Sequence, residues 1–169
     1  MKRGRFPEEE DAVILAGERG PVARVKHFAG RASAGVRPWI EASVNGDEAL
    51  TAELVQALAD LLPPGGYLMI GYGGDETERA LKRRVPPVVS PLGKALFDAG
   101  CAWFKDWYYP EGWMEGGMKL QGNKPASEEA RAANLAALRA ELEAWLAREH
   151  GDDELVERAR ARAREILAG

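Results

Sequence analysis

Two carboxylates in a glycine-rich stretch are the residues of this sequence best suited to chemistry. Glu111 and Glu115 flank Trp113 and Met114, where proline and glycine argue against a regular helix or strand. A carboxylate beside aromatic rings can bind a substrate amine, or act as a general base once desolvation raises its pKa. The simpler alternative is a pair of exposed loop carboxylates with no chemical role.

An aromatic strand leads into this loop. Its residues fall on two faces because side chains alternate along a strand with period two. One face carries Trp103, Lys105, Trp107 and Tyr109, and the other carries Phe104, Asp106 and Tyr108. Large aromatics on both faces predict a strand that is covered on both sides, with a partner for Lys105 and for Asp106. The density of tryptophan suits a packed core, and alternatively a ligand pocket or a subunit contact.

Each candidate substrate-binding residue carries an aromatic ring or a positive charge and lies near the two carboxylates in the sequence. They are Trp103, Lys105, Trp107, Trp113 and Lys119. A second group of cations, Arg79, Lys82 and Arg83, would suit a cofactor phosphate. The simpler interpretation is that these cations stabilise the negative end of a helix dipole. Cys101 is expected to be a small buried core residue.

Alternating strands and helices must position these residues. Period-two runs predict strands, and apolar residues at intervals of three or four, with capping residues, predict helices. Strands are expected at residues 12–16, 22–28, 39–44, 67–72, 103–109 and 118–121. Helices are expected from Asp47 to Leu62, from Asp75, over residues 91–100, from Ser127 and from Asp152. The first two strands are expected to form a hairpin. Gly100 is expected to end the helix of residues 91–100 in a left-handed conformation.

The strand–helix–strand alternation predicts an α/β fold. Residues 1–125 are expected to form one α/β domain. Residues 126–169 are expected to form a C-terminal helical hairpin that packs on this domain or pairs with a second copy of the chain. A homodimer is therefore one expected assembly.

Composition excludes several classes of protein. A net charge of -4 over 169 residues argues against general nucleic-acid binding. One cysteine excludes an internal disulfide, and two distant histidines without ligand spacing predict no metal. No run approaches the roughly 18 apolar residues that span a bilayer, so a cytoplasmic protein is expected. The partner expected at the aromatic residues is a small-molecule ligand. Abundant arginine, alanine, glutamate and proline suit a thermophile or a GC-rich genome.

The order of these elements resembles the later half of the Gcn5-related N-acetyltransferase (GNAT) fold. The matching elements are the strand ending at Val44, the helix after it, the strand at Tyr67, the helix ending at Gly100, the strand at Trp103 and the return strand at Met118. This resemblance implies a mixed, mostly antiparallel sheet flanked by helices, an acyl-CoA cofactor such as acetyl-CoA, and transfer of the acyl group to an amine. Glu111 or Glu115 would then take the amine proton. Tyr108 or Tyr109 would protonate the leaving thiolate.

Two positions depart from the pattern of that family. In the family, backbone amides at the helix start after the central strand bind the pyrophosphate of coenzyme A. Here that place holds residues 45–50, Asn-Gly-Asp-Glu-Ala-Leu, with two carboxylates. The tyrosine general acid of the family would stand four residues before Gly100, where this chain has Leu96. These departures keep open a non-catalytic small-molecule-binding or assembly module on the same fold.

Two further resemblances rest on short motifs. The whole chain is similar to a small uncharacterised bacterial and archaeal family that shares Pro-Pro-Gly-Gly, here residues 63–66, and Lys-Asp-Trp-Tyr, here residues 105–108. Residues 62–70 resemble the turn before the fifth strand of class I methyltransferases. A methyltransferase-like protein that uses S-adenosylmethionine is therefore a minor alternative, although the glycine-rich loop of that family is absent.

Overall fold

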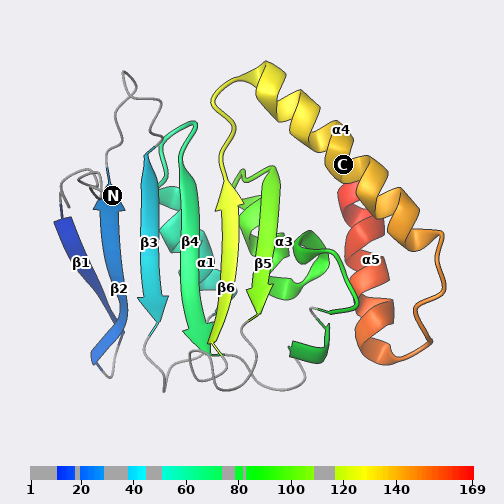
Figure 1. Ribbon diagram of the computed structural model, residues 1–169, viewed down its shortest axis with the longest axis horizontal. Helices are drawn as coiled ribbons and strands as arrows, with labels where there is room; N and C mark the ends of the chain where they lie inside the picture. The colour runs from blue at the N-terminus through cyan, green and yellow to red at the C-terminus, as the bar shows by residue number, and fades with distance from the viewer. Residues whose placement is uncertain are drawn as a thin grey trace, which may run out of the picture.

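Six strands form one mixed sheet in the computed structural model, which describes residues 11–17, 20–28, 38–44, 51–73, 79–81, 83–108 and 117–169 (Figure 1). The strands are β1 (Asp11–Gly17), β2 (Gly20–Phe28), β3 (Trp39–Val44), β4 (Tyr67–Gly73), β5 (Trp103–Tyr108) and β6 (Gly117–Asn123). They lie side by side in the order β1-β2-β3-β4-β6-β5. Of the described strand pairs, β3–β4 alone is parallel, and the other four are antiparallel. The predicted α/β class is confirmed as a mixed α+β fold.

Local sequence patterns located most of these strands. The predicted N-terminal hairpin is confirmed as the antiparallel pair β1–β2, in which the register shifts between Leu15 and Ala16. The predicted strand at residues 39–44 has the same bounds in the structure, and the one at 67–72 extends by one residue. The return strand is longer than the predicted residues 118–121. Of its additional residues, Gly122 and Asn123 pair with both β4 and β5, and Gly117 pairs with β4.

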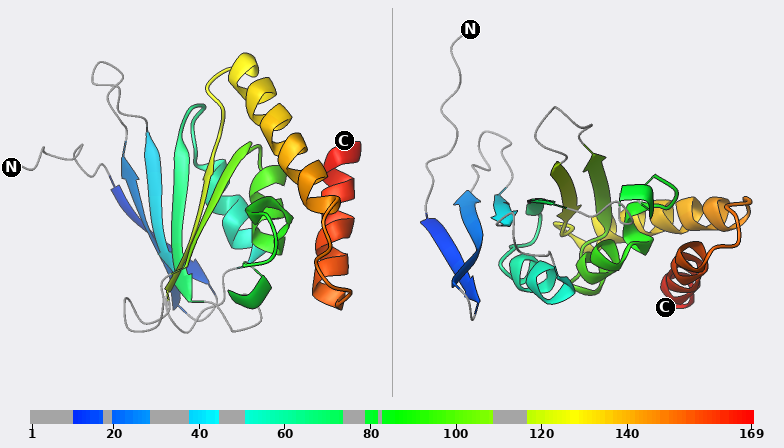
Figure 2. Two further views of the ribbon diagram at one scale, coloured as in Figure 1. Left: turned by 45° about the vertical axis from the view of Figure 1, so that its right-hand side comes forward. Right: turned by 90° about the horizontal axis from the view of Figure 1, so that it is seen from below.

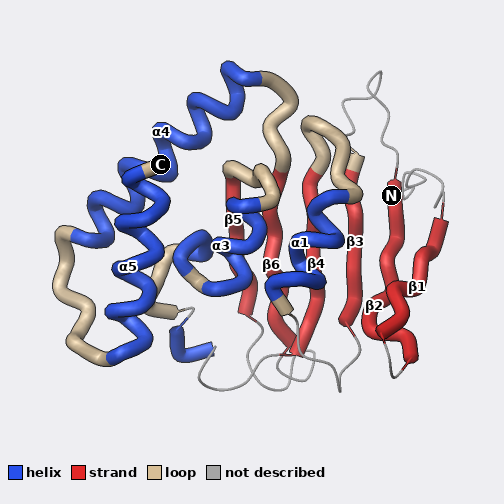
Figure 3. The backbone as a smooth tube through the Cα atoms, turned by 180° about the vertical axis from the view of Figure 1, so that it is seen from behind, coloured by secondary structure: helices blue, strands red, loops and turns tan. Residues whose placement is uncertain are grey.

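Two helices, α1 (Ala52–Asp60) and α3 (Pro91–Asp98), cover one face of the sheet (Figures 2 and 3). Every second residue of β3, β4 and β6 points into the core that these helices close. The fully buried members include Ile40, Leu68, Ile70, Leu120, Leu58 and Leu96. No described helix covers the opposite face, so the remaining strand residues point away from the core (Figure 1).

Helix α1 begins later than its sequence suggests. The predicted cap, Asp47, is wrong as a helix start, because the N-cap is Thr51, whose hydroxyl accepts a hydrogen bond from Leu54 N at 3.2 Å. Asp47 itself lies outside the described residues. Leu61 lies within the predicted helix but is 50% exposed, because the helix ends at Asp60 and Leu61 is its C-cap.

A turn of 3-10 helix, η2 (Pro87–Val89), leads into α3. Ser90, 2% exposed, caps α3: its hydroxyl accepts from Gly93 N at 3.0 Å and donates to Pro87 O at 2.7 Å. The helix ends as predicted, since Gly100 has φ +97°, a left-handed conformation that costs glycine little. Gly122 of β6 then lets α3 approach the sheet closely, because a Cβ there would lie 3.0 Å from Leu96 Cδ1.

The Pro-Pro-Gly-Gly motif of residues 63–66 forms the turn before β4. Gly65 has φ +80°, and a Cβ at this position would lie 3.1 Å from Ala126 Cβ. The turn is bound to the end of β6, because Gly65 N donates to Lys124 O at 3.0 Å and Lys124 N donates to Gly66 O at 2.9 Å. The motif therefore has a structural role in this chain.

The C-terminal helices α4 (Glu128–Leu146) and α5 (Glu154–Ala168) pack beside the sheet (Figure 1). Their second apolar core joins α4 and α5 to the segment before α3. Its buried members include Leu81, Val85, Val89, Leu142, Ala159 and Ile166. The predicted helix start at Ser127 is confirmed, because Ser127 is the N-cap of α4, whereas α5 is capped by Asp153 rather than begun by Asp152. Among the described helices, none is long and apolar enough to cross a membrane.

The turn between α4 and α5, residues 147–153, is bound to Arg84. The Arg84 guanidinium donates to His150 O at 2.9 Å and lies 2.5 Å from Asp153 Oδ2. Trp145 Nε1 donates to Arg84 O at 3.0 Å, and the Trp145 ring stacks on His150 with centroids 4.7 Å apart. One arginine thus connects the segment before α3 with both C-terminal helices.

Candidate functional site

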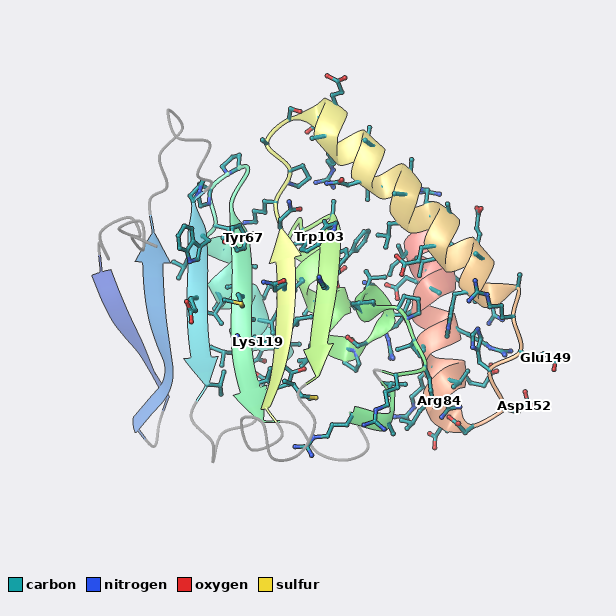
Figure 4. All side chains as sticks on the ribbon, in the orientation of Figure 1. Tyr67, Arg84, Trp103, Lys119, Glu149 and Asp152 are labelled. Carbon is teal, nitrogen blue, oxygen red and sulfur yellow. The ribbon has the colours of Figure 1, made fainter. Side chains whose placement is uncertain are left out.

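The face of the sheet opposite α1 and α3 gathers aromatic and polar side chains from four strands. We call it the open face and define it by Trp39, Glu41, Tyr67, Met69, Gly71, Trp103, Lys105, Lys119, Gln121 and Asn123. The strand register aligns its members in rows across the sheet. One row is Trp39, Tyr67, Asn123 and Trp103, and the next is Glu41, Met69, Gln121 and Lys105. Figure 4 shows Tyr67 and Trp103 toward one end of the strands and Lys119 toward the other.

An aromatic pair occupies the parallel strands of this face. The rings of Trp39 and Tyr67 stack with centroids 5.9 Å apart and an interplanar angle of 15°. Burial raises the pKa of the Tyr67 phenol above its usual range, and the negative charge of Glu41 raises the pKa further. Tyr67 is therefore a neutral hydroxyl at physiological pH that can donate a hydrogen bond.

Two amides continue the rows toward β5. Gln121 Nε2 donates to Met69 Sδ at 3.3 Å, which fixes the amide over β4. Asn123 Oδ1 is buried and accepts no hydrogen bond from a described residue. An unsatisfied buried acceptor costs roughly 1–3 kcal/mol and is unusual away from functional regions. Asn123 lies in the row between Tyr67 and Trp103, so this unsatisfied acceptor belongs to the open face.

Four of the five predicted substrate-binding residues belong to strands of this face. Trp103, Lys105 and Lys119 are members of the open face, and the register places Trp107 opposite Lys119. The prediction that β5 is covered on both sides is wrong. Trp103 is 43% exposed and Lys105 is exposed, because β5 is the last strand of the sheet and the α1–α3 layer covers only one face.

The predicted catalytic residues fall largely beyond what the structure describes. Glu111, Glu115 and Tyr109 lie outside the described residues, as does Trp113, and Tyr108 is placed by its backbone alone, opposite Met118. The strand ends nevertheless constrain where that segment starts. Residues 109–116 connect the last residue of β5 to the first residue of β6. The first residue of β6, Gly117, pairs with Gly73, the last residue of β4, so this connection starts and finishes at the end of the sheet where β4 terminates.

Arg79 and Arg83, the two predicted phosphate-binding cations that the structure describes, are not part of the open face. Lys82 lies outside the described residues; Arg79 is half-buried and Arg83 exposed in the segment before η2. Leu81 of the same segment is buried in the core with α4 and α5. Figure 4 places the neighbouring Arg84 beside α5, away from β3 and β4. The structure therefore does not bring Arg79 and Arg83 together with the aromatic residues of the open face.

Several members of the open face were not singled out from the sequence. They are Trp39, Glu41, Tyr67, Met69, Gln121 and Asn123. The signal was present, because each alternates with core residues of its strand, as in Trp39-Ile40-Glu41. What was missing is the sheet order, which decides that these strands are neighbours.

Cys101 is not a nucleophile in this fold. Its thiol is 2% exposed, as predicted, and burial raises its pKa to about 11, so the reactive thiolate is nearly absent at neutral pH. No group of three histidine, cysteine, aspartate or glutamate side chains within the described residues could hold a metal ion. The polar groups that the described members of the open face carry are hydroxyl, amide, carboxylate and ammonium groups.

Comparison with known proteins gives the family but no activity. Residues 1–149 match DUF1122, a family of proteins of unknown function, and helix α5 lies beyond the matched range. The chain belongs to the DUF1122 family. It is similar to the crystal structure of a protein of unknown function from Aquifex aeolicus VF5, with 31% identity and a TM-score of 0.70. The similarity covers 97% of this chain and 85% of that one. No curated protein matches the sequence.

Proposed function

We propose that this DUF1122 protein is an N-acyltransferase that moves an acyl group from a coenzyme A thioester to an amine, with the open face as part of its substrate site. The observation that carries the proposal is the parallel pair β3–β4, joined through α1, in a sheet whose other described strand pairs are antiparallel. This is the element order that the GNAT resemblance implies. The parallel pairing runs from Trp39 opposite Tyr67 to Ser43 opposite Gly71.

The reaction needs one proton acceptor and one proton donor. The amine nitrogen attacks the thioester carbonyl, a C–N bond forms, and the C–S bond breaks to release the coenzyme A thiolate. Glu111 or Glu115 would take the proton that the amine loses, and Tyr108 or Tyr109 would give a proton to the thiolate. The strand register supports this assignment of roles, because residues 109–116 follow β5 at the end of the sheet where β4 also terminates.

The open face would position the substrates for this step. The stacked Trp39 and Tyr67 offer a flat apolar surface with one hydroxyl donor, and Glu41 lies on the same face. Lys119 and Lys105 add positive charge on the β5 side, which suits the anionic parts of a thioester cofactor. The face thus carries separate groups for an amine and for an anion.

Acetyl-CoA binding and amine-dependent release of thiol test the proposal. Tryptophan fluorescence should respond saturably to acetyl-CoA and not to S-adenosylmethionine, which is the parallel ligand. Thiol release should then appear with a suitable amine, and it can be followed with a thiol reagent because Cys101 is buried. We expect Glu41→Gln to raise the KM for the amine, with Glu143→Gln on exposed α4 as the matched control. Absence of both acetyl-CoA binding and thiol release over a broad amine panel would exclude the proposal.

A second candidate, a non-catalytic binding or assembly module, is favoured by the start of α1. The Thr51 hydroxyl already occupies Leu54 N, and Glu53 puts a carboxylate in the first turn, so this helix start suits a phosphate poorly. Leu96, at the place of the family's tyrosine, is fully buried. The discriminating measurement is light scattering over a range of concentrations. A dimer that Trp113→Ala abolishes, without acetyl-CoA binding, would select the module.

A further inference from the structure

A cleft separates the first residues of β5 from α4, on the outer side of the sheet. Its volume is about 240 Å³, below the range of drug-sized ligand sites, so its occupant would be small. Apolar side chains of η2, β5 and α4 form most of its wall, among them Pro87, Val88, Ala102 and Leu138. Figure 1 shows α4 passing along the outer edge of the sheet beyond β5.

Three polar groups also line the cleft, and none of them has a partner among the described residues. They are the indole of Trp103, the amide of Asn134 and the carboxylate of Glu141. None of the three has a hydrogen bond or ion pair with another described residue. Asn134 and Glu141 are seven residues apart along α4, so two helical turns bring both side chains to the same face.

The charge of this lining has one sign. Glu141 is the charged residue among the lining side chains, and no lysine or arginine joins it. Trp103 is 43% exposed, so the face of its indole is available to a ligand. An indole face and a carboxylate both attract a cation, and the side-chain oxygen of Asn134 can accept a hydrogen bond from an ammonium group.

We propose that this cleft binds a small organic ammonium ion with an apolar body. The cationic end lies between Glu141 and the Trp103 ring, and the carbon skeleton packs against Val88 and Leu138. The cleft shares Trp103 with the open face but lies away from the residues proposed for proton transfer, because Trp103 and Tyr108 are at opposite ends of β5, roughly 17 Å apart at 3.3 Å per residue. The proposal therefore does not depend on the acyltransferase function.

A charge series on one carbon skeleton tests this assignment. The probes are isopentylammonium, neutral isopentanol and anionic isovalerate, added to protein labelled with 5-fluorotryptophan and observed by fluorine NMR. The chain has five tryptophans, and Trp103→Phe identifies the resonance of Trp103. We expect isopentylammonium to shift this resonance saturably and to bind about 3- to 30-fold more tightly than isopentanol, from one exposed ion pair and one cation–π contact. Isovalerate should bind most weakly.

Two surface variants separate the ion pair from nonspecific effects. Glu141→Gln should weaken isopentylammonium by about 2- to 5-fold and leave isopentanol unchanged. Glu143→Gln, an exposed carboxylate two residues away on α4, should change neither. Equal binding of all three probes, strongest binding of isovalerate, no shift of Trp103 with any probe, or indifference of isopentylammonium to Glu141→Gln would each overturn the proposal.

Discussion

Replacing Gly93 by alanine is expected to destabilise the protein, although the residue lies inside a helix. On helix propensity alone the substitution should stabilise α3 by about 1 kcal/mol. The structure predicts the opposite sign. A Cβ at Gly93 would lie 1.9 Å from Pro87 O and 2.7 Å from Pro87 C, distances at which the backbone of η2 must move.

The magnitude follows from the groups that this movement separates. Overpacking a well-filled site costs about 1–3 kcal/mol, and 1.9 Å belongs at the upper end of that range. The same Cβ would lie 3.0 Å from Ser90 Oγ, which caps α3 through Gly93 N, and losing such a cap costs about 1 kcal/mol. The propensity gain offsets the cap loss. We therefore expect a net destabilisation close to 3 kcal/mol.

Urea unfolding followed by circular dichroism and tryptophan fluorescence measures this quantity. In a separate thermal unfolding experiment, the midpoint temperature of the Gly93→Ala variant should fall by about 6–12 °C, given about 2–4 °C per kcal/mol for a chain of this size. The matched control is Gly71→Ala in β4, where the nearest atom to a new Cβ is Ala42 O at 3.8 Å. It should be neutral or stabilising by up to about 1 kcal/mol, because glycine weakens a strand interior. If Gly93→Ala is as stable as the wild type or more so, the packing of η2 on α3 has been misjudged.

Three further predictions concern single side chains. Cys101, with a pKa of about 11, should not react with a thiol reagent at pH 7 until urea unfolds the chain, and rapid reaction of the folded protein would contradict its burial. The raised pKa of Tyr67 means that its contribution to stability is present below pH 10 and is lost as pH rises through the folded value. The difference in alkaline absorbance between wild type and Tyr67→Phe should therefore be centred above pH 10, and Glu41→Gln should move it downward. The pKa of Asp153 is lowered by the Val156 backbone N–H and by Arg84, so its contribution is present above about pH 4 and is lost in more acidic solution. Arg84→Met should weaken this effect and accelerate hydrogen exchange in the α4–α5 turn, whereas unchanged exchange would show that the turn does not depend on Arg84.

Much of the fold was predictable because its signals are local. The hairpin β1–β2 follows from two strand-like runs joined by the turn composition of residues 17–21. The caps Ser127 and Gly100 lie where side-chain chemistry and backbone conformation place them. The start of α1 was mistaken because Asp47 and Thr51 are both good capping residues. Which of them caps is decided by the turn of helix that packs Val55 and Leu58 against the sheet.

The candidate site was predictable only in part. Trp103, Lys105 and Lys119 were singled out because they lie near one another in the sequence, on β5 and its return strand. Trp39 and Tyr67 are far from them along the chain and were missed. They join the same rows because β6 inserts between β4 and β5, which carries each row across four strands.

The sequence by itself determined which side chains of each strand share a face, because alternation along a strand is a local property of the backbone. It also determined the absence of a disulfide, since the chain has one cysteine. Only the tertiary structure decided the order of the strands and which face α1 and α3 cover. The physical reason is that strands pair through backbone hydrogen bonds common to all residues, so the choice of neighbour depends on how the whole core packs.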